Sequence, residues 1–131
     1  MKKILGIGTA LVDVISQVED STISQLNLSK GSMTLIGEEQ IQEIRSSFVE
    51  PLMTSGGSVC NTVHELNYSD HDASFYGKLN NDEYGKAFLK DLQSAGIGFQ
   101  GVIKEKGLPT GCCNILVSPD GERTMATHIG I

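Results

Sequence analysis

The sequence contains no tryptophan, few cysteines, few prolines and no long apolar run. Three cysteines, of which Cys112 and Cys113 are neighbours, are too few for a disulfide framework, so a reducing cytoplasm is the expected setting. No apolar stretch approaches the length of a membrane span. The start imitates a signal peptide poorly, because its apolar run includes Asp13. We therefore expect a cytoplasmic protein with no membrane partner.

Basic charge is also scarce. Ten basic residues stand against 16 acidic ones, which gives a net charge of −6, and no basic cluster exceeds the pair Lys2-Lys3. A chain of this charge is a poor partner for duplex nucleic acid or for an anionic membrane. A small anionic ligand is not excluded, because one helix N-terminus or one arginine can hold it locally.

The chain does have the length and apolar content of one compact domain, with 131 residues of which 39% are hydrophobic. Stretches rich in Ile, Val and Leu alternate with segments of helical apolar spacing, which favours an α/β fold with a parallel sheet. The sequence CCNILVS, the turn Pro119-Asp120-Gly121 and RTMATH together predict a hairpin, and thus a small second sheet. Strands are predicted at residues 4–8, 11–18, 33–36, 52–54, 73–76 and near 102–103, and helices from about Asp20, Glu38, Ser58 and Asn80.

Several residues predict where these helices begin and end. Asn80 and Glu83 have the spacing of a capping box, and Ser58 is expected to cap the helix that follows the glycine pair. Gly96 stands where a C-cap glycine belongs, and Pro51 is expected to close the helix that begins near Glu38.

Two short motifs that suggest chemistry are better explained by structure. Gly6-Ile7-Gly8 begins like a dinucleotide fingerprint, but its third glycine would fall at Leu11 and a β-branched run follows where a helix is required. Cys60 and His64 share a helix face, yet a metal site needs three or four convergent ligands, so we interpret this pair as structural.

Asp13 is the strongest single candidate for a ligand contact. It lies inside an apolar strand, where a carboxylate without partners is costly to bury. Its position alone fits a cap for a neighbouring turn as well as it fits a ligand role. A vicinal diol, as on a ribose, would suit it, since each carboxylate oxygen can accept one hydrogen bond.

Residues 55–61 read SGGSVCN and mark the change from a strand to a helix. The glycine pair serves either a tight turn, in which Gly56 or Gly57 takes a positive φ, or the close approach of a ligand. Asn61 lies in the first helical turn, near free backbone N–H groups, and its amide can both donate and accept hydrogen bonds. The stretch therefore suits recognition of a polyol as well as a turn.

The order of these motifs resembles the amino-terminal half of the ribokinase-like (PfkB) carbohydrate and nucleoside kinases. Gly8 and Asp13 are followed by GGSVCN, GKLNNDEYG and PTGCCNILVSPDGERTM, in that order over essentially the whole chain. The segments LVDV, LSKGSMTL, PTG and GERTM are most similar to the adenosine kinase-like branch. The resemblance implies a Rossmann-like layered α/β sheet with helices, plus a small β-sheet lid that closes over the sugar, incomplete in this chain.

The resemblance also assigns roles to residues. Asp13 would bind the sugar hydroxyls, and Asn61 would add hydrogen bonds to the ring. Leu11 and Met33 would supply apolar contacts from the lid or against a base, and Arg123 would approach the transferred phosphate. Three further residues would line the sugar pocket, namely Gly56, Gly57 and Ser58.

The activity implied is phosphorylation of the primary hydroxyl of a sugar or nucleoside, with adenosine or another ribose compound as the best candidate and with ATP and Mg²⁺ as cofactors. The family's second signature, a DTxGAGD-like segment with the catalytic base and the anion hole, does not occur in this sequence. We therefore expect residues 1–131 to be the substrate-binding and lid portion, without the ATP-binding part and inactive alone. The alternative is a non-catalytic protein that binds a sugar or nucleoside, or forms a homodimer through the lid sheet.

Overall fold

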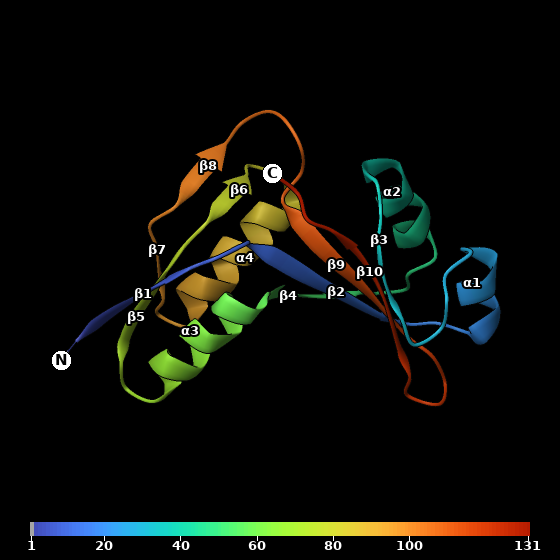
Figure 1. Ribbon diagram of the computed structural model, residues 1–131, viewed down its shortest axis with the longest axis horizontal. Coiled ribbons are helices and arrows are strands. Elements are labelled where there is room, and N and C mark those ends of the chain that lie inside the picture. The colour runs from blue at the N-terminus through green and yellow to red at the C-terminus, as the bar shows by residue number, and fades with distance from the viewer. Residues whose placement is uncertain (1) are drawn as a thin grey trace.

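Residues 2–131 are described by a computed structural model, in which two main sheets lie side by side and share one hydrophobic core (Figure 1). The helices are α1 (Asp20–Gln25), α2 (Glu38–Ser46), α3 (Ser58–Tyr68) and α4 (Glu83–Ser94). The strands are β1 (Lys3–Ile7), β2 (Leu11–Gln17), β3 (Met33–Leu35), β4 (Leu52–Gly56), β5 (Asp72–Tyr76), β6 (Lys78–Asn80), β7 (Gly98–Phe99), β8 (Val102–Lys104), β9 (Gly111–Val117) and β10 (Arg123–His128). Every predicted strand is present, and the short strands β6 and β7 are additional.

One sheet is parallel and has the order β1-β5-β7, with Lys3 to Ile7 paired in register with Asp72 to Tyr76. Helix α3 packs against β1 and β5, and α4 contacts β7. Parallel strands joined by helices confirm the parallel α/β sheet predicted from the sequence pattern, and they form the Rossmann-like layer that the resemblance implies. A pair of short parallel strands, β6 and β8, continues beside this layer.

The second sheet has five strands in the order β3-β10-β9-β2-β4 and corresponds to the lid predicted from the resemblance. The predicted hairpin is confirmed as the antiparallel pair of β9 and β10, and β2 pairs in parallel with β9 and antiparallel with β4. Helices α1 and α2 lie at this end of the molecule (Figure 1). The lid is therefore larger than a hairpin alone would make it, because β2, β3 and β4 join it from earlier in the chain.

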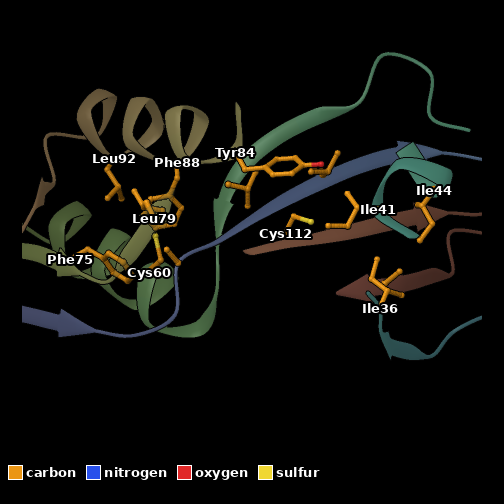
Figure 2. Packing of buried hydrophobic residues seen from close by; sticks show 14 of the residues in the cluster. Ile36, Ile41, Ile44, Cys60, Phe75, Leu79, Tyr84, Phe88, Leu92 and Cys112 are labelled. Carbon is orange, nitrogen blue, oxygen red and sulfur yellow. The ribbon is translucent and has the colours of Figure 1, made fainter. Parts of the chain in front are cut away.

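The hydrophobic core runs from one sheet to the other. Figure 2 shows Phe75 and Phe88 at one end and Ile41 at the other, with the ring of Tyr84 between them. Phe75 and Phe88 contact each other at a centroid distance of 5.3 Å, a tilted arrangement that aromatic rings favour. Helix α4 thus lies at the junction of the Rossmann-like layer and the lid.

The predicted helix ends are partly wrong. Asp82, not Asn80, caps α4, because its carboxylate accepts the N–H of Gly85 at 2.8 Å, whereas Asn80 ends strand β6. Ser58 is the first residue of α3 and Gly57 is its N-cap, so Ser58 does not cap that helix. Helix α2 ends at Ser46, five residues before Pro51. Gly96 does follow α4 with a φ of 73°, as predicted.

In the stretch from residue 2 to residue 131, no helix is long and apolar enough to cross a membrane.

Candidate functional site

Strand β2 divides its side chains between two environments. Val12, Val14 and Ser16 are buried, and the two valines belong to the hydrophobic core. Leu11, Asp13 and Ile15 point to the opposite side of the sheet and are only partly buried. Side chains alternate between the two faces of the strand, so Asp13 is not fully buried, while its neighbours Val12 and Val14 fix the strand in the core.

Strand register extends the Asp13 side of the sheet across all five strands. Thr54, Cys113 and Thr127 lie in one row with Asp13, because paired residues project from the same face. We call this surface the open face, and its residues are Leu11, Asp13, Ile15, Met33, Leu35, Leu52, Thr54, Cys113, Ile115, Met125 and Thr127. Most of these side chains are apolar, and Asp13 is their only carboxylate.

The carboxylate of Asp13 lies directly over Gly56 on the neighbouring strand. A β-carbon at position 56 would be 2.5 Å from Oδ1 and 2.6 Å from Oδ2 of Asp13. The missing side chain of Gly56 therefore makes room for the carboxylate itself. This explains one of the two glycines, for which the sequence left open a tight turn or the close approach of a ligand.

The second glycine, Gly57, is required by its backbone conformation, since it adopts a φ of 90° as the N-cap of α3. The N–H of Asn61 donates to the carbonyl of Gly57 at 2.9 Å, which closes the first turn, and the Asn61 side chain is exposed. Thr9, Val59 and Ile129 join the predicted residues Leu11, Gly57 and Ser58 around a hollow of about 300 Å³ at this helix start.

Burial and charge act in opposite directions on Asp13. Burial raises the pKa of its carboxyl group above the usual value, and the positive charge of Arg123 partly offsets that rise. Arg123 begins β10, where it pairs with Val117, so its own backbone is not in the row of Asp13. Asp13 and Arg123, for which the resemblance implies separate roles, thus interact through charge across the open face.

Met33 is on the same face as Asp13 but not beside it. It lies on β3, at the edge of the sheet, and two strands separate β3 from β2. Three interstrand spacings amount to roughly 14 Å. The side chain of Met33 is 56% exposed, so it contributes to the apolar surface at the edge of the sheet and not to the surroundings of Asp13.

Sequence reasoning missed two sets of residues near Asp13. The first is Cys113 with Thr127, whose hydroxyl donates to Sγ of Cys113 at 3.3 Å, and burial raises the pKa of this thiol. Their place could have been found by extending the hairpin register from its turn. The second is Asp91, which accepts hydrogen bonds from Ser55 although 36 residues separate the two, and no local motif signals it.

The open face does not form a metal site. Within residues 2–131, no three His, Cys, Asp or Glu side chains gather where they could hold a metal ion. The Mg²⁺ that accompanies ATP in the expected reaction therefore does not fit these residues alone, since magnesium sites use carboxylates together with substrate phosphates. Cys60 is fully buried, and His64 bonds Ser55 through Nε2 at 3.0 Å, which suits a structural role for both.

The chain matches the model of the pfkB family carbohydrate kinases over residues 1–130. It is 30% identical over 95 residues to the ATP-dependent ribose-1-phosphate kinase of Halopiger xanaduensis, a match that covers 72% of this chain and 30% of that protein. The solved adenosine kinase of Sinorhizobium meliloti has 33% identity and a TM-score of 0.80, over 98% of this chain and 39% of that one. The adenosine kinase of Schistosoma mansoni in complex with adenosine has 26% identity and a TM-score of 0.81, over 97% and 38% respectively. The chain thus spans well under half the length of these relatives.

Proposed function

Since this chain belongs to the pfkB family of carbohydrate kinases, we propose that it forms the substrate-binding side of an enzyme that transfers phosphate from ATP to the primary hydroxyl of a sugar or nucleoside. The observation that carries the proposal is the half-buried carboxylate of Asp13, set over Gly56 on an otherwise apolar face. Adenosine or another ribose compound is the proposed substrate. The two adenosine kinases and the ribose-1-phosphate kinase among the similar proteins support a ribose-containing ligand.

Asp13 would hold the sugar by accepting one hydroxyl hydrogen bond on each carboxylate oxygen. A carboxylate on an apolar face gains more from such bonds than one in water, because few competing water molecules reach it. Asn61 and the free N–H groups at the start of α3, next to Gly57 and Ser58, would bind further polar atoms of the ligand. Leu11 lies at the same hollow and would pack against the ring.

The apolar part of the open face would receive the base of a nucleoside, or exclude water above a sugar. Met33 and Leu35 project from β3 at the edge of this surface, 56% and 62% exposed. Arg123 would stabilise negative charge on the transferred phosphate. Residues outside this chain would bind ATP and Mg²⁺ and would supply the catalytic base, so residues 1–131 alone would be inactive.

The three cysteines are free and buried, which supports a reducing compartment for the enzyme, and we place it in the cytoplasm.

The proposal is tested by ATP consumption of the native full-length protein with adenosine, ribose or fructose as the acceptor. We expect turnover with a ribose compound and its loss in Asp13→Asn. The reading frame is a second test, since it should continue past Ile131 into a DTxGAGD-like segment. A stop codon at that point, or no turnover with any of the three acceptors, would count against a kinase.

The exposed apolar residues of the open face favour one second candidate, a non-catalytic protein that dimerises through the lid sheet. Leu35 and Leu52 are 62% and 64% exposed there, and a second copy would cover them. Sedimentation with and without adenosine separates the two functions. A dimer that adenosine neither binds nor changes would favour the second.

A further inference from the structure

We infer that Asp91 on α4 is a positioning residue of the substrate site, which acts through Ser55 and Gly56 on Asp13. Its contacts are independent of any ligand, whereas their consequence for binding rests on the proposed function. Asp91 has no role in the residue assignments that the family resemblance implies.

Asp91 holds the free edge of the lid sheet. Strand β4 is last in the order β3-β10-β9-β2-β4, so its outer backbone groups have no strand partner among residues 2–131. Oδ2 of Asp91 accepts the Ser55 N–H at 2.9 Å, and it also accepts the Ser55 hydroxyl and, at 3.3 Å, the Thr54 hydroxyl. One carboxylate oxygen thereby takes the place of a neighbouring strand for this part of β4.

The segment that Asp91 holds is the one that Asp13 lies against. Thr54 pairs with Asp13 in the β2–β4 register, and Gly56 directly follows Ser55. The carboxylate of Asp13 and the backbone of Gly56 are in contact, with no space for a β-carbon between them. A small displacement of β4 would therefore move Asp13 or change how deeply it is buried.

His64 fixes the same serine from a second helix. The hydroxyl of Ser55 has a single proton, which it donates to Asp91, so its oxygen must accept the hydrogen bond at 3.0 Å that joins it to Nε2 of His64. His64 must then carry a proton on Nε2. Helix α3, which starts two residues after Gly56, is in this way tied to α4 through one buried hydroxyl.

The charge of Asp91 is suited to this task. Burial opposes its ionisation, but hydrogen bonds from the side chain and backbone of Ser55, together with His64 and the Thr54 hydroxyl, hold the pKa of Asp91 below its usual value. A charged acceptor makes stronger hydrogen bonds than a neutral one. Asparagine at this position would keep the volume but lose the charge.

The experiment compares Asp91→Asn with Asp70→Asn, the same change at an exposed loop residue. The pKa of Asp13 is measured by carboxyl ¹³C NMR without ligand, and adenosine affinity is measured by calorimetry. Asp91→Asn should shift the pKa of Asp13 and weaken adenosine binding roughly tenfold, because donors of β4 lose their charged acceptor. Asp70→Asn should change neither quantity. ¹⁵N NMR of His64 should show a proton on Nε2.

If Asp91→Asn fails to fold, the Ser55→Ala variant replaces it as the test of the positioning role. This variant removes the hydroxyl and leaves the backbone N–H of β4 in place. A folded Asp91→Asn or Ser55→Ala variant with an unchanged Asp13 pKa would overturn the inference. The wild-type chain could also fail to bind adenosine while the Asp91→Asn change still shifts the pKa of Asp13. That result would contradict the proposed substrate and support the positioning role.

Discussion

The proposed function of Asp13 requires a charged form that destabilises the fold. Burial raises its pKa, so the folded chain favours the protonated form more than the unfolded chain does. The stability that this group contributes is present at low pH and is lost as the pH rises through the raised pKa. Ionised Asp13 therefore weakens the fold at neutral pH, a cost that a ligand with hydroxyl donors would offset.

Replacing Asp13 should separate these two effects. Asp13→Asn and Asp13→Ala are expected to abolish ligand binding, while the melting temperature at pH 7 stays the same or rises. Adenosine calorimetry and thermal unfolding measure the two quantities. Unchanged affinity in both variants would show that the carboxylate only caps a turn.

Ligand binding should also depend on pH in a defined direction. Only the ionised carboxylate accepts hydrogen bonds on both oxygens, so adenosine affinity should fall as the pH is lowered through the raised pKa of Asp13. Hydroxyl donors favour the ionised form, and binding near that pH should release protons. Calorimetry in buffers of different ionisation enthalpy detects this release. Affinity that is constant across this range would argue against a direct contact.

The two adjacent glycines should respond differently to alanine. Gly56→Ala would place a β-carbon against the Asp13 carboxylate, so we expect binding to be lost through displacement of that side chain. Gly57→Ala keeps clear of Asp13 but forces alanine to a φ of 90°, which costs about 1–2 kcal/mol of folding stability. Urea unfolding and adenosine affinity, measured for both variants, distinguish the two roles. Equal loss of binding in both would mean that the pair acts only as a turn.

Helix α4 depends on a cap that extends beyond the helix. Asp82 accepts the N–H of Gly85, and both the N–H and the hydroxyl of Thr110, all at 2.8 Å. Asp82→Ala should therefore cost about 2 kcal/mol, more than loss of an isolated cap, because it also frees the start of β9. Chemical denaturation measures the difference, with Asp72→Ala on an exposed strand position as the control. A loss no greater than that of the control would contradict the double role.

This cap also shows what the sequence could and could not predict. Helices and strands followed from apolar periodicity, and the hairpin from Pro119-Asp120-Gly121, because these signals are local. The start of α4 was misplaced at Asn80 because the spacing of Asn80 and Glu83 imitates a capping box, and the bonds from Thr110 to Asp82, 28 residues away, could not be predicted because no local pattern signals them. Asp91 was missed for the same reason. The position of Asp13 on a strand and the positive φ at the glycine pair could be predicted because both depend on neighbouring residues, whereas the role of Asp13 and Gly57 in binding stays a prediction.

Within residues 2–131, one edge of the parallel sheet and the apolar side chains beside it are uncovered. Strand β1 ends the order β1-β5-β7, so one of its edges has no strand partner. Leu5 and Ile7 on β1 and Tyr76 on β5 are 46%, 69% and 40% exposed. Apolar side chains along a free parallel edge are typical of a surface that further chain covers, because parallel sheets are normally buried on both faces.

Residues 1–131 by themselves are therefore expected to self-associate through this face. Ile7→Lys should reduce the association, since it puts a charge at the most exposed of the three positions, whereas Val49→Lys should not, although Val49 is 76% exposed. Val49 lies outside both sheets, beyond the end of α2, so it controls for the added charge alone. Sedimentation velocity over a range of concentrations measures the effect. Equal association in the two variants would place the contact elsewhere, with the open face of the lid as the next surface to test.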